Sequence, residues 1–198
     1  MQEGIIKFNC EWLNKKPLPA NQLKEIIFWR NKLFKLKLIC AGKDGIGYGN
    51  ISIRHRKEQF IISGSQTGIK KIADENDFTL ITEFNISKNY IKCEGTVKAS
   101  SESLTHAAIY SALPEINAVI HVHDKEAWNK FKNKMPTTSE SAEYGTPKLA
   151  QEIFRLSKSP EIFNTKIIIL AGHEDGIISF GKSLDEAFNL LISQTKDI

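Results

Sequence analysis

Hydrophobic positions near the N-terminus partly follow a helical period. After a mixed lead-in over residues 1–16, residues 22–39 predict a helix, with Asn21 available as its N-cap and Gly42 as its stop. A basic helix can bind nucleic acid, but no aromatic or base-reading pattern accompanies this one. Its cations therefore predict a solvated face: Lys24, Arg30, Lys32, Lys35 and Lys37.

Short apolar runs separated by turns follow in the first half of the chain. Residues 59–63, 78–84 and 90–93 predict strands, and residues 54–58 predict a charged hairpin tip. Residues 72–77 predict a turn region. Several short strands joined by turns favour an antiparallel sheet.

The centre of the chain combines a helix start with a strand that ends in histidines. Ser100, Ser101 and Glu102 mark the start of a helix of small and apolar residues. The strand over residues 118–120 then leads to the pair His121 and His123. Since strand side chains alternate between faces, both imidazoles point the same way.

The last third predicts a helix, two strands and a final helix. Thr146 begins a helix that runs to about Leu156, with Pro147 in its first turn. Residues 165–170 and 177–180 predict strands. The capping-box spacing of Ser183 to Glu186 opens the last helix, of about ten residues.

Three of the five histidines fall at a strand end or a strand break, where functional sites are commonly built. They are His121, His123 and His173. Imidazole is the commonest nitrogen ligand of zinc, which needs more than two ligands. Two histidines on one strand face are ordinarily plain polar residues, but the third histidine and the nearby carboxylate favour a metal site.

The serine-rich helix start has its own chemistry. Unpaired N–H groups and a partial positive charge at a helix N-terminus suit an anion, and Ser100 and Ser101 add hydroxyl donors. Ordinary helix capping is the alternative for the serines, and interaction with the helix dipole is the alternative for Glu102. His106 lies one turn beyond Glu102 and is expected to be a buried structural histidine.

Four sequence blocks together resemble the class II aldolase/adducin family, which includes L-fuculose-phosphate aldolase and ribulose-phosphate 4-epimerase. They begin at Gly49 (G-N-I-S-I-R), Ser100 (S-S-E-S-L-T-H), Ala118 (A-V-I-H-V-H) and Gly172 (G-H-E-D-G-I-I-S-F-G), in the family's order. The resemblance implies an α/β fold, a three-layer α/β/α domain with a mainly antiparallel central sheet. It also implies a homotetramer with sites at subunit interfaces.

The resemblance also implies the roles of individual residues. Zn²⁺, or another divalent ion such as Mn²⁺ or Co²⁺, is expected on His121, His123 and His173, with Glu102 as the catalytic acid/base. The positions expected to bind the substrate's phosphate are Gly49, Asn50, Thr67, Gly68, Ser100 and Ser101. Ser65 is an alternative in the second of these turns, and a plain polar turn is the other. The expected activity is that of a zinc-dependent lyase, which cleaves a small phosphorylated sugar through a metal-stabilised enediolate.

The segment after His123 departs from the family pattern. It is shorter and carries no tyrosine before Tyr144, so the family's proton-donating tyrosine has no counterpart. A sugar-phosphate dehydratase or 4-epimerase, a non-catalytic adducin-like module and a cupin-type metalloenzyme therefore remain open. Glu174 and Asp175 separate His173 from the next glycine and are expected to be turn residues.

Composition adds limits without changing this interpretation. The 198 residues, 41% hydrophobic and 25% charged, predict one domain over 1–198. A net charge of +4 fits anionic small molecules and does not require nucleic acid. The three scattered cysteines indicate a reducing compartment and are expected to be buried thiols. With no signal peptide and no run long enough to span a bilayer, the protein is expected to be cytoplasmic.

Overall fold

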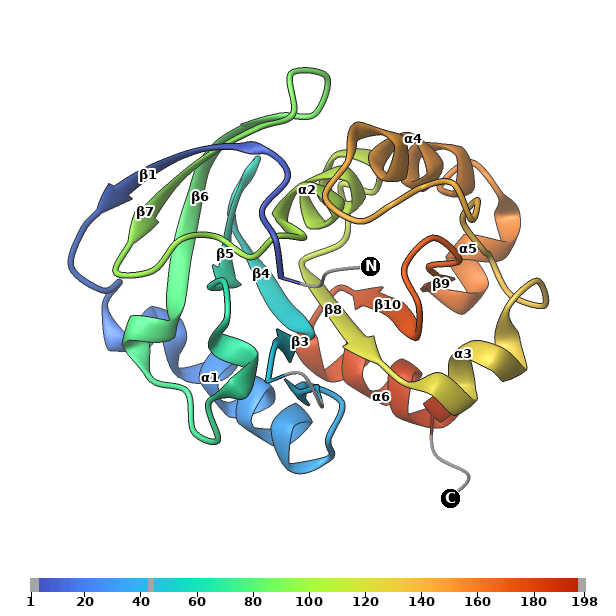
Figure 1. Cartoon of the computed structure of the whole chain (residues 1–198), viewed down its shortest axis with the longest axis horizontal. Helices are drawn as coiled ribbons and strands as arrows, with labels where there is room; N and C mark the ends of the chain where they lie inside the picture. Colours follow the sequence, from blue (N-terminus) through green and yellow to red (C-terminus); the bar gives the residue numbers. More distant parts are fainter. Residues whose placement is uncertain (1–3, 43–44, 196–198) are drawn as a thin grey trace.

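An eight-stranded sheet forms the centre of the molecule (Figure 1). The structure is a computed structural model that describes residues 4–42 and 45–195. The strand order is β1-β7-β6-β5-β4-β8-β10-β9. All neighbouring strands are antiparallel, except that β1 is parallel to β7.

The strands of the large sheet are β1 (Asn9–Asn14), β4 (Asn50–Arg56), β5 (Gln59–Ser63), β6 (Phe78–Asn85), β7 (Tyr90–Gly95), β8 (Ala118–His123), β9 (Ile167–Ile169) and β10 (Gly176–Gly181). A separate two-stranded ribbon pairs β2 (Cys40–Ala41) with β3 (Gly47–Tyr48). The helices are α1 (Ala20–Lys35), α2 (Ser103–Ala112), α3 (Lys125–Phe131), α4 (Pro147–Leu156), α5 (Pro160–Thr165) and α6 (Leu184–Thr195). Two short 3₁₀ turns are η1 (Thr67–Ile69) and η2 (Glu75–Asp77).

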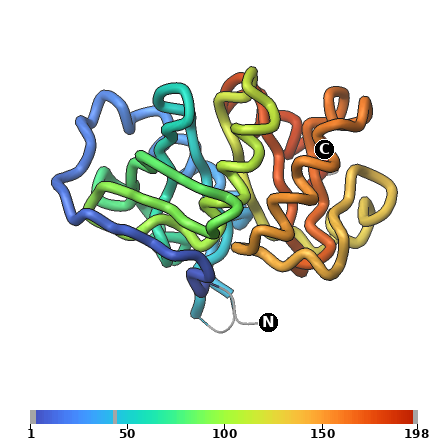
Figure 2. The backbone as a smooth tube through the Cα atoms, turned by 90° about the horizontal axis from the view of Figure 1, so that it is seen from above, coloured from blue at the N-terminus to red at the C-terminus, as the bar shows by residue number. Residues whose placement is uncertain are grey.

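Helices cover both faces of the sheet, so the core is split into two clusters. One cluster packs α2, α4 and α5 against one face, and the other packs α1, α3 and α6 against the opposite face. Alternation along β5 shows how: Ile62 belongs to the first cluster and Ile61 to the second. Seen from above, the N-terminal half lies to one side of the later segments (Figure 2). The predicted three-layer α/β/α fold with a mainly antiparallel sheet is confirmed.

The first helix differs from its prediction at both ends. It spans Ala20–Lys35 and is preceded by Pro19, with no side-chain cap, so Asn21 is not its N-cap. The helix ends because Lys37 adopts a left-handed backbone with φ of 61°, so Gly42 is not its stop. The predicted solvated face is also wrong at one position, since Arg30 is only 1% exposed.

Three elements were missed by the sequence analysis. The lead-in contains β1, whose register places Trp12 opposite Cys93 on β7. Helix α3 is capped by Asp124, which accepts a 2.9 Å hydrogen bond from the Ala127 N–H, and α5 is capped by Ser159. Their apolar faces are too short to give a clear helical period.

Other predictions differ from the structure by a few residues. Strand β4 continues to Arg56, so the expected hairpin tip at 54–58 shrinks to its end. The strand predicted at 165–170 is confined to Ile167–Ile169, because α5 occupies the residues before it. Thr146 caps α4, as predicted, and Ser183 accepts the N–H of Glu186 at the start of α6.

Strand β9 ends the sheet but its outer edge is covered. The Ile169 N–H donates to the Pro136 carbonyl at 2.9 Å, and the Thr138 N–H donates to the Ile169 carbonyl at 3.0 Å. The residues from Pro136 to Thr138 therefore act as a cover for a strand made only of isoleucines.

The three cysteines are free thiols, as the sequence analysis expected, but only Cys93 is buried. Cys10 and Cys40 are half-buried, and Cys10 Sγ lies 3.9 Å from Cys93 Sγ. None of the described helices is long and apolar enough to cross a membrane.

Candidate functional site

The three predicted histidines converge at one end of the central strands. Ring centroids are 5.1 Å apart for His121 and His123, 5.1 Å for His121 and His173, and 4.7 Å for His123 and His173. One ring nitrogen from each histidine lies within 4.8 Å of the others. Small rotations of the rings are enough for one divalent ion to be reached by all three.

Strand pairing explains this convergence. His121 and His123 lie two residues apart on β8 and share a face, while β10 pairs with β8 and places Gly176 opposite His123. The turn between β9 and β10 carries His173 back over this pair. A side chain at Gly176 would lie 3.2 Å from His121 Cε1 and 3.3 Å from His173 Cγ, so glycine permits the close approach.

The hydrogen bonding of His121 leaves Nε2 toward the cluster. Its Nδ1 lies 3.2 Å from the Ile177 carbonyl, an acceptor, so Nδ1 carries the proton and Nε2 carries the lone pair. Burial lowers the pKa of His121 well below its ordinary value, and the Glu102 carboxylate only partly opposes this. Burial also lowers the pKa of His123. Neutral imidazoles are the form that binds a metal.

Glu102 directs its carboxylate into the cluster from the residue before α2. It is 2% exposed, and Oε1 lies 2.7 Å from His173 Nδ1 and 3.3 Å from His121 Nε2. Burial raises the pKa of Glu102, but the neighbouring His121 and His173 outweigh it, so the pKa is lowered overall. In the described part of the chain, Glu102 Oε2 has no hydrogen-bond partner. A buried carboxylate held ionised beside imidazoles suits proton transfer or support of a cation.

His106 belongs to a buried network behind this carboxylate. Its Nδ1 lies 2.7 Å from the Ser52 hydroxyl, which lies 2.8 Å from the Tyr110 hydroxyl. All three side chains are buried, and burial lowers the pKa of His106 to about 4. The residue is therefore a neutral structural histidine, the role that the sequence favoured.

Two tyrosine rings pack on the outer histidines. The Tyr48 ring lies 4.8 Å from the His123 ring, and the Tyr144 ring lies 4.8 Å from the His173 ring. Tyr144 is 1% exposed, and Lys7 Nζ lies 4.0 Å from the centre of its ring. These contacts fix the imidazole planes, and the sequence analysis did not foresee that of Tyr48, which gave no signal beyond its place in a glycine-rich turn.

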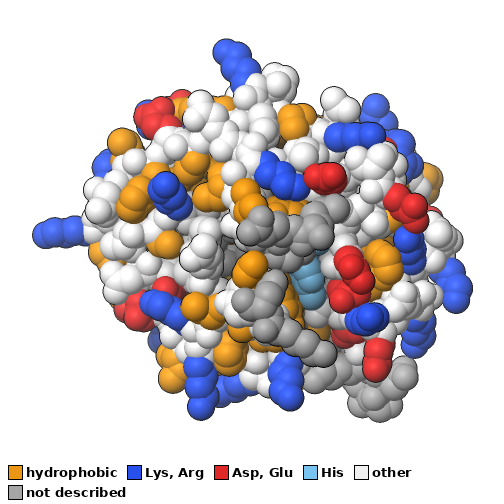
Figure 3. Space-filling model, viewed as in Figure 1, with side chains coloured by type: hydrophobic (Ala, Val, Ile, Leu, Met, Phe, Trp, Pro, Cys, Tyr) orange, Lys and Arg blue, Asp and Glu red, His pale blue; other side chains and the backbone are white. Residues whose placement is uncertain are grey.

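A polar cavity adjoins the histidines on their open side. In the space-filling view, a histidine side chain reaches the surface in the middle of this face (Figure 3). The cavity is lined by Gly4, Gly47, Tyr48, Gly49, Asn50, Gly64, Ser65, Gln66, Gly68, Ser100, Ser101, Glu102, His121 and His123. Its lining is rich in hydroxyl groups, an amide and glycines, which expose backbone N–H groups to an anion.

Five of the six predicted phosphate-binding positions line this cavity: Gly49, Asn50, Gly68, Ser100 and Ser101. Asn50 is opposite His121 in the β4–β8 pairing, and its Oδ1 has no hydrogen-bond partner among the described residues. The Ser100 hydroxyl accepts the Glu102 N–H at 3.3 Å. None of the described residues hydrogen-bonds to the Ser101 hydroxyl, which is therefore available to a ligand.

Thr67 is the position that does not line the cavity. Its hydroxyl donates to the Gly64 carbonyl at 2.8 Å, so it closes the turn instead of facing the cavity. Ser65, the alternative named from the sequence, lines the cavity together with Gly68. Glu174 and Asp175 lie in the turn before β10, where Asp175 has a left-handed φ of 62°, and neither belongs to the histidine cluster.

The fold and the site define a three-layer α/β protein with a candidate three-histidine metal centre beside a candidate anion-binding cavity. Its sequence matches the family model described as Class II Aldolase and Adducin N-terminal domain over residues 36–195. The chain belongs to this family.

Solved structures share the fold at low sequence identity. An L-fuculose 1-phosphate aldolase is 22% identical with a TM-score of 0.65, covering 88% of this chain and 82% of its own. A sugar-phosphate aldolase from Thermotoga maritima is 16% identical with a TM-score of 0.66, covering 88% and 90%. YgbL of Escherichia coli, a putative aldolase/epimerase/decarboxylase, is 17% identical with a TM-score of 0.66, covering 90% and 88%.

Proposed function

We propose that this protein is a metal-dependent lyase that acts on a small phosphorylated sugar. The observation that carries the proposal is the meeting of three imidazoles, a buried carboxylate and a polar cavity within one site. Membership of the class II aldolase and adducin family supports an enzyme of this general kind.

The donor set fits a divalent ion. Three neutral nitrogen ligands with an open side are typical of catalytic zinc, and His123 Nε2 has no hydrogen-bond partner in the described ranges. Zn²⁺ is therefore the proposed ion, with Mn²⁺ and Co²⁺ as alternatives. Bound there, the ion would supply Lewis-acid stabilisation of negative charge on the substrate's oxygens.

The surrounding side chains bind the substrate and move its proton. Asn50, Ser101 and the Gly68 turn hold the phosphate, which orients the sugar toward the histidines. Glu102 accepts and returns the proton that the reaction transfers, as a general acid/base. Its burial between α2 and β8 excludes water from the carboxylate.

Dehydration or 4-epimerisation on the same site is the second candidate. It is favoured by the absence of a free tyrosine ahead of β9, since Tyr144 is buried against His173. Both reactions use the same grip on metal and phosphate. Aldol cleavage is the first choice because the donor set and cavity match the resemblance most completely.

A homo-oligomer, and specifically a tetramer that works in the cytoplasm, completes the proposal. Large apolar side chains stand exposed around the cavity mouth and on the nearby turn, with Ile69 50% and Ile72 72% exposed. A neighbouring subunit on this face would complete the acid/base set. Light scattering of the purified protein measures the assembly.

The deciding experiment screens the purified protein, loaded with zinc, manganese or cobalt, against ketose and aldose phosphates. Carbon–carbon cleavage supports aldol chemistry, while water loss or inversion supports the second candidate. The double variant His121→Ala/His123→Ala is the control. We expect it to remain folded and to lose bound metal and activity together; full zinc retention in this variant would contradict the proposal.

A further inference from the structure

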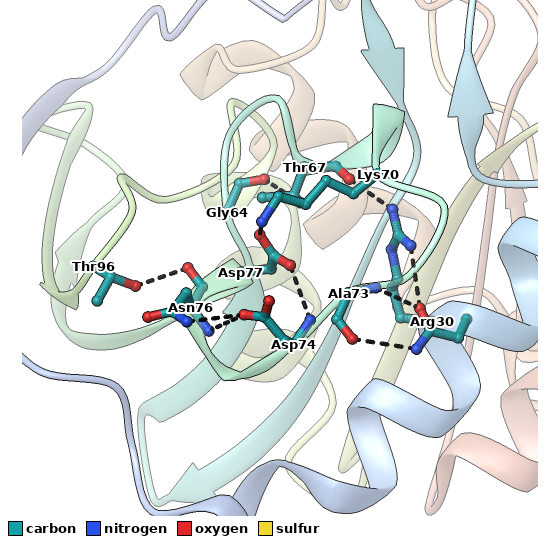
Figure 4. Close-up of polar contacts among 10 residues, drawn as sticks. Arg30, Gly64, Thr67, Lys70, Ala73, Asp74, Asn76, Asp77 and Thr96 are labelled. Carbon is teal, nitrogen blue, oxygen red and sulfur yellow. Dashed lines mark hydrogen bonds and ion pairs between the residues drawn. The ribbon is translucent and has the colours of Figure 1, made fainter.

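Arg30 is a buried cation on α1, directly behind the turn that borders the cavity. It is 1% exposed, and its Nη2 donates to the Thr67 carbonyl at 2.6 Å (Figure 4). Nη1 donates to Asn31 Oδ1 at 3.2 Å, and the guanidinium carbon lies 5.1 Å from the centre of the Phe34 ring. The side chain thus spans from the helix to the backbone of η1.

The charge of Arg30 has no carboxylate in contact with it. Asp77 is the nearby buried acid, but its carboxylate contacts Lys70 Nζ at 2.6 Å and accepts the Asp74 N–H at 2.9 Å (Figure 4). Throughout the described residues, no ion pair involves Arg30. Burial lowers the pKa of Arg30, and the Asp77 charge opposes this. A buried cation without a contacting anion is unfavourable unless the protein uses the charge.

The bond from Arg30 also fixes the orientation of a peptide group. A trans peptide is planar, and its C=O and N–H point in opposite directions. Because the Thr67 carbonyl points to Arg30, the Gly68 N–H points the other way. Gly68 itself lines the cavity, and a side chain there would lie 3.0 Å from backbone atoms of Gly47 and Tyr48.

A second clamp holds the same segment against α1. The Asn31 amide donates to the Ala73 carbonyl at 3.3 Å, and its Oδ1 accepts the Ala73 N–H at 2.8 Å. Neighbouring residues of α1 therefore grip the segment at Thr67 and at Ala73. Of these two side chains only Arg30 brings a charge to the turn.

We propose that Arg30 is a positioning residue of the phosphate subsite, which holds the Gly68 N–H toward the bound phosphate and places a positive charge behind it. This inference rests on the proposed function, since it requires a phosphate in the cavity. The phosphate would supply the anion that the buried guanidinium lacks. Arg30 would thereby favour a dianionic phosphate over a neutral sugar.

The test measures binding of inorganic phosphate by calorimetry in the wild type, Arg30→Met and Arg30→Lys. Arg30→Met removes the charge and the bond to Thr67, so we expect the dissociation constant to rise about ten-fold or more. Arg30→Lys keeps the charge, and we expect it to recover part of this loss. Zinc affinity is expected to stay unchanged in both, because the histidines lie on other elements.

Arg54→Met is the matched control. Arg54 is also partly buried, donates to the carbonyls of Ile116 at 2.9 Å and Tyr110 at 3.0 Å, and stacks on the Tyr110 ring, away from the cavity. Its loss is expected to lower stability without changing phosphate affinity. An equal loss of phosphate affinity in Arg54→Met and Arg30→Met would overturn the inference.

The remaining outcomes separate the inference from the proposed function. If the wild type binds phosphate and Arg30→Met binds it within two-fold, the inference fails while the phosphate site stands. If the wild type itself does not bind phosphate, both fail. Should Arg30→Met not fold, ¹⁵N spectra of the wild type decide: the Gly68 amide signal must shift on phosphate addition, and an unmoved signal contradicts the inference.

Discussion

Oε1 of Glu102 lies 2.7 Å from Nδ1 of His173, although the two residues come from opposite halves of the chain. Glu102 precedes α2, and His173 lies in the turn between β9 and β10. The contact joins the carboxylate to the histidine cluster, so a change in either residue is expected to be felt by the other.

Glu102→Gln tests the proton-transfer role. The amide keeps the shape of the side chain but cannot exchange a proton, so we expect turnover of the substrate found by the screen to fall roughly 10²- to 10⁴-fold. Bound metal is expected to remain stoichiometric, because the three histidines are intact. Turnover and metal content are measured on the same preparation, and wild-type turnover would remove Glu102 from the mechanism.

The metal-free protein is expected to lose stability as the pH falls from about 6.5 to 4. Burial lowers the pKa of His106 to about 4, so in this range the unfolded chain binds a proton that the folded chain does not. Stability contributed by the neutral histidine is thus complete above the unfolded pKa and declines below it. The change amounts to about 3 kcal/mol for this one group.

His106→Gln isolates that contribution. Urea denaturation across this pH range is expected to show a slope smaller by about one proton than in the wild type. The slope is the readout, so a general loss of stability in the variant does not affect the result. An identical slope in both proteins would mean that His106 titrates normally when folded.

Ser52→Ala is expected to lower the free energy of unfolding by about 1–3 kcal/mol. The change leaves His106 Nδ1 and the Tyr110 hydroxyl without the oxygen that joins them in a buried network. Ser179→Ala is the control, since Ser179 Oγ is buried with no partner in the described part of the chain. Its stability should be unchanged or higher, and equal losses in the two variants would argue against the network.

Gly176→Ala is expected to weaken zinc binding about ten-fold or more, because the new methyl group would press on His121 Cε1 at 3.2 Å and on the His173 carbonyl at 3.0 Å. Gly95→Ala introduces similar crowding, 2.9 Å from Thr79 Oγ1, in a strand far from the histidines. Competition with a chelating dye compares the two variants. Similar zinc affinities for both would mean that Gly176 does not set the ligand geometry.

Much of the site was visible in the sequence because strand periodicity is local. The spacing of His121 and His123 fixes a common face without any tertiary information, and the break after residues 165–170 makes His173 the available third donor. The serines and Glu102 were placed by the start of one helix. Their distances to the histidines required the structure.

Features that depend on long-range packing could not be predicted. Arg30 has the spacing of a solvated cation on a helix, and only its contact with Thr67 shows that it is buried. The hydroxyl of Thr67 turns inward to Gly64, which no local pattern distinguishes from an outward one. Strand β1 depends on a parallel pairing with β7, a partner that lies far along the chain.

The cover over β9 bears on the solubility of the protein as it folds. Strand β9 consists of three isoleucines, and an open edge of that composition is a template for pairing with other chains. The residues from Pro136 to Thr138 occupy its hydrogen-bonding groups. Shortening that stretch would leave an adhesive border on the sheet, so this piece of backbone guards against aggregation.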